Sequence, residues 1–470
     1  MTLHGGEREV IDGAQVRLCF DGPRPERLVA VGTVSGYGLV DVHSASGVAL
    51  SHDDGVIDLS VMGDDHCLDY AVDFSALAEA VREGDWWRAF RVRDTGMLVT
   101  RPAMWLWRPP RYLASAKIEL EIRRPAHTEF SASWTPSPAS DGAEVEHFIL
   151  DSTLYRWLGY VAMGDFVAER FEHQGAQVEL LRPHLQVSVS DEGWRGWIED
   201  AIDSVTMLYG AFPRSRLQVL TLPVVGHDDP VLGGTACRGG GSGVMLIFDA
   251  NAEDDQLPGH WVTVHELLHH GMPFVDGTWM SEGFVTYYTT VLRTRRGQRS
   301  EQRGWSALID GFTRGQDHEV PASLREASER INELGAYHRV YWGGAAVAFL
   351  LDVALRVDSE GERSLDDAMR ELRRCCDSRE RPSARSLLEH LDRWYGKPLF
   401  TSTALPLLDS AEFPDVESAL ERLGVEADGS FDPEHPGAAM RRAIMAPREP
   451  TERSATGIVS LSSKAELRAE

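Results

Sequence analysis

The sequence predicts a multidomain α+β protein, and three observations support this fold class. At 470 residues the chain is too long for one compact hydrophobic core, so two or three domains are expected. The first third contains short alternating segments typical of β-strands, of which residues 117–123 are the clearest example. From about residue 185 the pattern changes to that of a mixed sheet followed mainly by helices, which favours an α+β domain.

These patterns divide the chain into three expected regions. Residues 1–180 are expected to form a β-rich, β-sandwich-like accessory domain, and residues 185–425 an α+β domain. Residues 426–470 form a short tail that is expected to be loosely packed or partly disordered, because prolines and arginines interrupt it.

The expected elements of the second domain follow from hydrophobic periodicity. In chain order they are a strand at 185–189, a helix over 194–208, a strand at 217–225, a glycine-rich loop at 233–243 and a strand at 244–248. Either Ser190 or Asp191 is suited to cap the helix, because both side chains accept hydrogen bonds from free helical N–H groups. Beyond Trp261 helical spacing dominates.

The charge and the termini exclude several classes of partner. The formal net charge of −26 disfavours binding to nucleic acids and to anionic membranes. The first nine residues have neither a basic region nor an apolar segment of the kind found in a signal peptide, and no apolar run approaches membrane-spanning length. A cytoplasmic location is therefore expected, whereas the oligomeric state is left open.

The cysteines predict no disulfide framework. There are five, an odd number, at positions 19, 67, 237, 375 and 376, and no CxxC pair occurs among them. This usage is typical of a reducing compartment.

One helical segment carries the residues of a metal site. In His265-Glu266-Leu267-Leu268-His269 the two histidines are four residues apart and therefore share one helix face. Zinc accepts two such imidazoles, and a catalytic site adds a third protein ligand while leaving one position for water. Glu266 adjoins the first ligand, where its carboxylate can act as a general base on that water.

A third ligand is expected from the apolar segment that follows. Glu282 stands at the start of an aromatic helix, where a carboxylate is costly unless it is coordinated or paired. The alternative is an ordinary acidic residue of a first helical turn, stabilised by the helix dipole.

With these motifs the chain resembles the gluzincin peptidases, in which HExxH is followed by a glutamate in a W-x-x-E-G-F-type motif. The resemblance implies a thermolysin-like catalytic domain and a zinc metallopeptidase, with Zn²⁺ on His265, His269 and Glu282 and with Glu266 as general base. Twelve residues separate His269 from Glu282, which is shorter than usual in the aminopeptidase N branch. This shortening affects the expected substrate-facing wall more than the ligand itself.

A later segment, Tyr341-Trp342-Gly343-Gly344, resembles the Y-x-K-G helix of gluzincin aminopeptidases, most closely the glycyl aminopeptidase family, which usually carries a PDZ domain. The resemblance implies that Tyr341 donates a hydrogen bond to the oxyanion of the tetrahedral intermediate. Gly343 departs from the family's lysine, and too few residues follow for a PDZ domain. The alternative is that Tyr341 is an ordinary buried aromatic residue without a catalytic role. Tyr337 and His338 are weaker candidates for the oxyanion-stabilising role.

The motif that holds the substrate's amino group in these aminopeptidases is only partly matched. The best counterpart is residues 233–238, where Ala236 stands in the position of the glutamate. A methyl group cannot bind an ammonium, so aminopeptidase specificity does not transfer. The sequence leaves three functions open, each of which involves a peptide as substrate or ligand. They are an aminopeptidase with an altered anchor for the amino group, an endopeptidase or other zinc hydrolase, and a non-catalytic protein that retains the metal.

Overall fold

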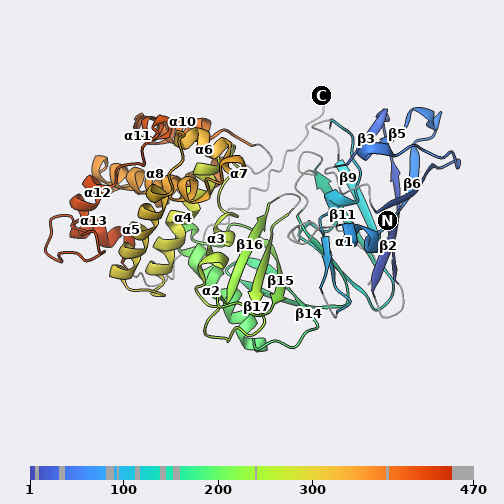
Figure 1. Ribbon diagram of the computed structural model, residues 1–470, viewed down its shortest axis with the longest axis horizontal. Helices are drawn as coiled ribbons and strands as arrows, with labels where there is room; N and C mark the ends of the chain where they lie inside the picture. Colours follow the sequence, from blue (N-terminus) through green and yellow to red (C-terminus); the bar gives the residue numbers. More distant parts are fainter. Residues whose placement is uncertain are drawn as a thin grey trace, which may run out of the picture.

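The computed structural model of the chain runs from a β-rich end, through a central sheet, to a helical end (Figure 1). It describes residues 1–5, 10–30, 38–80, 89–92, 95–111, 117–137, 144–151, 159–238, 241–376 and 381–446. The structural statements below concern these residues. The order of sheets first and helices afterwards confirms the expected multidomain α+β architecture.

Two sheets form the N-terminal part. The larger has the strand order β11-β9-β1-β2-β6-β4, and the smaller has the order β10-β12-β8-β7. The strands are β1 (Thr2–Gly5), β2 (Ile11–Cys19), β4 (Leu39–Ser44), β6 (Cys67–Asp73), β7 (Ala89–Arg91), β8 (Leu98–Thr100), β9 (Lys117–Arg123), β10 (Glu129–Ala132), β11 (Val145–Asp151) and β12 (Val161–Gly164), with β3 (Arg27–Val29) and β5 (Val56–Asp58) as a separate pair. The two larger sheets share one hydrophobic core, so the region is sandwich-like, and the strand at 117–123 is confirmed.

The sequence predicted no disulfide framework, and this prediction was wrong, because the four cysteines at positions 19, 67, 375 and 376 form two disulfides. Cys19 and Cys67 lie directly opposite each other on the antiparallel strands β2 and β6 and are joined by a disulfide. Cys375 and Cys376, at the end of helix α9 (Leu365–Cys375), are also joined. The first pair is 48 residues apart in sequence, and only the strand register brings its two sulfurs together.

The central sheet has the strand order β13-β14-β15-β17-β16. Its strands are β13 (Phe166–His173), β14 (Ala176–Pro183), β15 (Arg216–Val224), β16 (Val231–Cys237) and β17 (Gly243–Asp249). The first two strands both begin before residue 180, so this sheet begins earlier in the chain than the expected domain division; the division itself stays a prediction. The N-terminal part contacts the sheet through Ser131, whose hydroxyl accepts a hydrogen bond from Gln218 at 2.9 Å.

Two elements of this region differ from expectation. The strand predicted at 185–189 is absent, because β14 ends at Pro183, whose ring nitrogen cannot donate to a further ladder bond. The first part of the glycine-rich segment predicted as a loop, residues 233–237, belongs to strand β16 at the edge of the sheet, while Gly239 and Gly240 lie outside the described residues. The other two expected strands are confirmed as β15 and β17.

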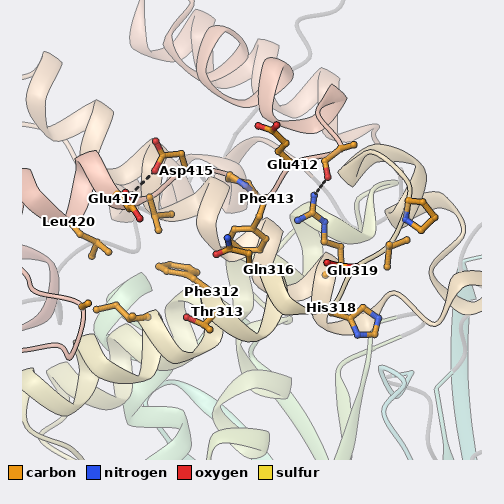
Figure 2. Close-up of a pocket in the computed structure, with 18 residues that line it drawn as sticks. Phe312, Thr313, Gln316, His318, Glu319, Glu412, Phe413, Asp415, Glu417 and Leu420 are labelled. Carbon is orange, nitrogen blue, oxygen red and sulfur yellow. Dashed lines mark hydrogen bonds between the residues drawn. The ribbon is translucent and has the colours of Figure 1, made fainter.

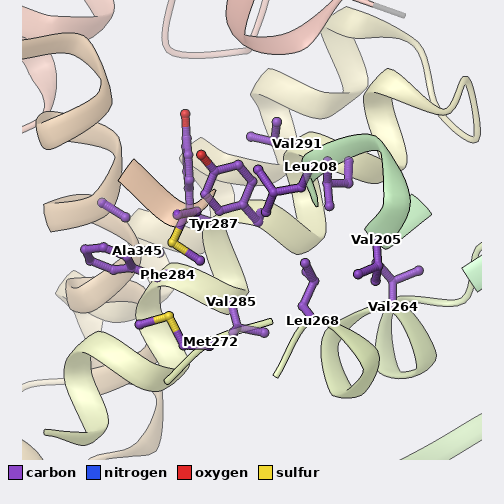
Figure 3. Packing of buried hydrophobic residues seen from close by; sticks show 14 of the residues in the cluster. Val205, Leu208, Val264, Leu268, Met272, Phe284, Val285, Tyr287, Val291 and Ala345 are labelled. Carbon is purple, nitrogen blue, oxygen red and sulfur yellow. The ribbon is translucent and has the colours of Figure 1, made fainter. Parts of the chain in front are cut away.

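Helix α2 (Asp191–Tyr209) follows the expected pattern, with Ser190 as its cap accepting a hydrogen bond from the Gly193 N–H. The helical end consists of α3 (Trp261–Leu268), α4 (Thr278–Arg295), α5 (Glu301–Asp317), α6 (Leu324–Glu329), α7 (Ile331–Leu334), α8 (Tyr337–Asp358), α9, α10 (Ala384–Tyr395), α11 (Leu399–Asp409), α12 (Glu417–Leu423) and α13 (Ala438–Met445). Their apolar faces share one core with α2, as the packing of Leu208, Leu268 and Phe284 illustrates (Figure 3).

The tail is more ordered than expected up to residue 446. Ile444 and Met445 of α13 are fully buried, and the Ile444 carbonyl accepts a hydrogen bond of 2.7 Å from Nε of buried Arg295. Within this segment, the buried Arg441 donates a hydrogen bond to the Leu423 carbonyl, where composition alone had indicated disorder. Residues 447–470 lie outside the described part of the chain.

Helix α8 is apolar and 22 residues long, which by length and composition is sufficient to cross a membrane. However, 72% of its most apolar stretch is buried inside the protein, as in the core helix of a globular domain. The feature is therefore weak evidence for a membrane span.

Candidate metal centre

Helices α3 and α4 bring the three predicted metal ligands together. His265 lies in α3 and His269 at its C-terminal cap, and each residue is 5% exposed. Oε2 of Glu282, from the first turns of α4, lies 3.2 Å from Nε2 of His265 and 3.3 Å from Nε2 of His269. Two nitrogens and one oxygen therefore converge from two helices, with all three within 4.8 Å of one another.

The local electrostatics stabilise a charged carboxylate at this point. Burial would raise the pKa of Glu282, but His269 and His265 hold it well below its usual value. Burial would likewise lower the pKa of His265, which Glu282 and Glu266 instead raise. The charged form of each group is thus stabilised by neighbours of opposite charge.

The donor set fits a zinc ion. Two imidazoles and one carboxylate are a typical protein ligand set for catalytic zinc. Thr289 lies behind the site, with its hydroxyl 3.4 Å from Nδ1 of His265, and this contact can orient the ring. Nδ1 of His269 is buried without a hydrogen-bond partner among the described residues, so no hydrogen bond to this nitrogen from those residues orients the ring.

Glu266 lies against the edge strand of the central sheet. Its Oε2 accepts a hydrogen bond of 2.8 Å from the N–H of Ala236 in β16. A Cβ atom at Gly234 would lie 2.6 Å from Cγ of Glu266, so only glycine allows this close approach. The strand therefore fixes the direction in which the Glu266 carboxylate points.

Tyr341 reaches the same site from α8. Its ring lies 6.1 Å from that of His265, centroid to centroid, and the two planes differ by 6°. Burial, followed by the nearby carboxylates of Glu282 and Glu266, raises the pKa of Tyr341 far above its usual value. The hydroxyl therefore keeps its proton and can act as a hydrogen-bond donor.

A contact between two glycines sets the spacing of α4 and α8. A Cβ at Gly283, next to Glu282, would lie 2.3 Å from Cα of Gly344, and a Cβ at Gly344 would lie 2.0 Å from the Trp279 carbonyl oxygen. The backbones of the helices that carry Glu282 and Tyr341 thus touch without intervening side chains.

Sequence reasoning missed Arg238, which follows β16. Its Nη1 donates to the carbonyl oxygens of His269 at 3.3 Å and of Met272 and Pro273 at 3.4 Å, and its guanidinium lies 4.9 Å from the Phe274 ring. A cation here complements the C-terminal end of α3. Its position inside the glycine-rich segment 233–243 was the available signal, but nothing in the sequence showed that the strand packs against this helix.

Cys237 ends strand β16 beside the candidate site. Burial raises the pKa of its thiol to about 12, which disfavours the nucleophilic thiolate.

A large cavity lies in the helical part, between α5 and the segment before α12 (Figure 2). Its volume is about 1070 Å³, and Glu319, Glu412, Asp415 and Glu417 line it together with Arg339. None of the three candidate ligands, Glu266 or Tyr341 borders it. The cavity is therefore separate from the candidate metal centre.

Comparisons with known proteins address the fold. Neither protein-family models nor curated protein sequences give a match. Solved structures do: an aminopeptidase N family protein from Idiomarina loihiensis is 16% identical with a TM-score of 0.66, over 88% of this chain and 76% of that one.

Two further solved structures agree. An M1 zinc metallopeptidase from Deinococcus radiodurans is 16% identical with a TM-score of 0.53, over 88% of this chain and 94% of that one. Yeast LTA4 hydrolase is 14% identical with a TM-score of 0.53, over 88% of this chain and 67% of that one. The chain therefore has the fold of the M1 zinc metallopeptidases, the gluzincin scaffold that its motifs resemble.

Proposed function

We propose that the protein is a zinc-dependent metallopeptidase of the gluzincin type. The convergence of His265, His269 and Glu282 within 4.8 Å is the observation that carries this proposal. The fold shared with zinc metallopeptidases supports it.

The remaining site residues suit peptide-bond hydrolysis. A zinc ion held by the three ligands supplies a Lewis acid that polarises the scissile carbonyl and lowers the pKa of water. Glu266, oriented by the Ala236 N–H, takes the proton of the attacking water and returns it to the leaving amine. The Tyr341 hydroxyl donates a hydrogen bond to the oxyanion of the tetrahedral intermediate.

The substrate preference follows from Ala236. Its backbone contacts Glu266, so position 236 borders the reaction site, yet it offers only a methyl group. An ammonium at the substrate's N-terminus gains no carboxylate partner from this position. We therefore favour a peptidase that does not require a free N-terminus, while an aminopeptidase with an anchor elsewhere is the alternative.

The general base is tested by the substitution Glu266→Gln. Gln keeps the shape and the Ala236 contact but cannot accept the proton, so zinc content should stay near one equivalent while turnover falls by about 10³-fold or more. Peptidase activity that survives in this variant contradicts the assignment. Absence of stoichiometric zinc in the wild type would instead favour the non-catalytic reading.

The specificity is tested with paired fluorogenic peptides that differ only in N-acetylation. The proposal expects kcat/KM to be similar for the acetylated and free forms. A strong preference for the free amine would show that another group anchors it.

A further inference from the structure

A second cavity lies beside the turn that follows His269, at the far end of α3. Its volume is about 520 Å³. Residues 270–273 form one wall and the end of α9 forms another. Four arginines line it, namely Arg214, Arg370, Arg373 and Arg374.

This concentration of positive charge is unusual in a chain with a net charge of −26. Carboxylates neutralise part of it: Asp367 lies 3.2 Å from Nη1 of Arg370, and Glu371 pairs with Arg374 at 2.8 Å. Arg373 donates to the Pro213 carbonyl at 3.3 Å, a neutral acceptor that leaves its charge in place. Counted over the described residues, the cavity therefore keeps a surplus of positive charge.

The arginines are also held in place by the backbone around them. Nε of Arg370 donates to the Leu208 carbonyl at 2.7 Å, and Nε of Arg214 donates to the His270 carbonyl at 3.1 Å. In the described part of the chain, Arg370 uses two of its five N–H groups in hydrogen bonds and Arg373 uses one. The chain therefore positions these two arginines and leaves further donors on them for a ligand.

Buried groups at the cavity provide an independent sign of a ligand. His270 lines the cavity and is 1% exposed, and neither ring nitrogen has a hydrogen-bond partner among the described residues. Tyr209 is not a lining residue, but its hydroxyl lies beside Gly271 of the cavity wall and is also buried without a hydrogen-bond partner among the described residues. Leaving such a group unsatisfied costs about 1–3 kcal/mol, a cost that a bound oxyanion would offset.

We propose that this arginine cavity binds a small phosphate-bearing anion. Guanidinium groups match phosphate oxygens in bidentate geometry, and a cluster of them favours a ligand with several negative charges. A volume of about 520 Å³ exceeds that of one phosphate and lies within the usual range of small-molecule sites. The proposal does not depend on peptidase activity.

Isothermal titration of the zinc-loaded full chain with pyrophosphate, at constant ionic strength, tests the proposal. We expect saturable binding that Arg373→Ala and Arg370→Ala each weaken by about tenfold, as expected for the loss of one charge-assisted hydrogen bond. Both side chains are exposed at the helix surface, so folding should be unaffected, which the urea midpoint verifies. Arg393→Ala is the matched control, because it removes an equal charge from the last turn of neighbouring α10, outside the cavity.

A parallel titration with ADP identifies the source of the phosphate. Tighter binding of ADP than of pyrophosphate shows that a nucleoside fills the remaining volume, and equal binding shows recognition of phosphate alone. Zinc measured before and after titration detects metal removal by the probe. Absence of saturable binding, or binding that the Arg373 and Arg370 substitutions leave unchanged, overturns the proposal.

Discussion

Replacing Tyr341 by phenylalanine removes one oxygen from the candidate site and little else. The substitution retains the aromatic ring, which lies nearly parallel to the His265 ring at a centroid distance of 6.1 Å. The packing between α8 and α3 should therefore persist. Burial and the carboxylates of Glu282 and Glu266 raise the pKa of the hydroxyl, which favours its protonated form. What is lost is therefore a neutral hydrogen-bond donor rather than a ligand or a base.

The expected magnitude follows from this role. Removing one oxyanion donor from a water-excluded site costs about 2.7–4 kcal/mol of transition-state stabilisation, or about 10²–10³ in kcat. KM should change little, because the hydrogen bond strengthens only when the oxyanion forms. Zinc content should stay unchanged, since Tyr341 contributes none of the converging donor atoms.

The assay is steady-state hydrolysis of a fluorogenic peptide, with zinc measured on the same preparations. Tyr337→Phe is the matched control: Tyr337 lies one helical turn earlier, is 49% exposed, and donates its hydroxyl to Asn332 at 2.6 Å. We expect this control to retain full kcat. A Tyr341→Phe variant with unchanged kcat, or one that loses zinc, would refute the role assigned to the hydroxyl.

Two further predictions concern stability. Asp352 is fully buried and accepts hydrogen bonds from Arg356 at 2.9 Å and from the Tyr287 hydroxyl at 2.8 Å. The substitution Asp352→Ala should therefore lower the free energy of unfolding of the helical part by about 3–5 kcal/mol, as measured by urea unfolding. A loss below about 1 kcal/mol would contradict this prediction. The Cys19–Cys67 disulfide spans 48 residues, so replacing both cysteines by serine should cost up to about 4 kcal/mol, and a reductant should then have little further effect on the N-terminal part.

The candidate site could be predicted from the sequence where helix geometry alone determines it. His265 and His269 share a helix face by their spacing, and the motif around Glu282 indicated a third ligand, which the structure places within 3.3 Å of both imidazoles. The order of sheet and helices was also readable, because periodicity depends on neighbours in the chain.

Features that depend on partners distant in sequence could not be predicted in this way. Gly234 suggested a loop, but the structure shows a glycine required by the approach of a strand to Glu266. Cys19 and Cys67 are paired through strand register, which composition does not contain. Arg441 belongs to a tail predicted to be loose, yet its guanidinium is 1% exposed and bonded to the Leu423 carbonyl.

The touching glycines of α4 and α8 limit how this enzyme scaffold can be altered. Any side chain at Gly283 or Gly344 would push apart the helices that carry Glu282 and Tyr341, so neither position can vary without moving both groups. A mutant library aimed at new substrates should therefore keep both glycines fixed and place its diversity at Ala236, in the edge strand β16. Changes there can alter recognition while α4 and α8 preserve the distance between Glu282 and Tyr341.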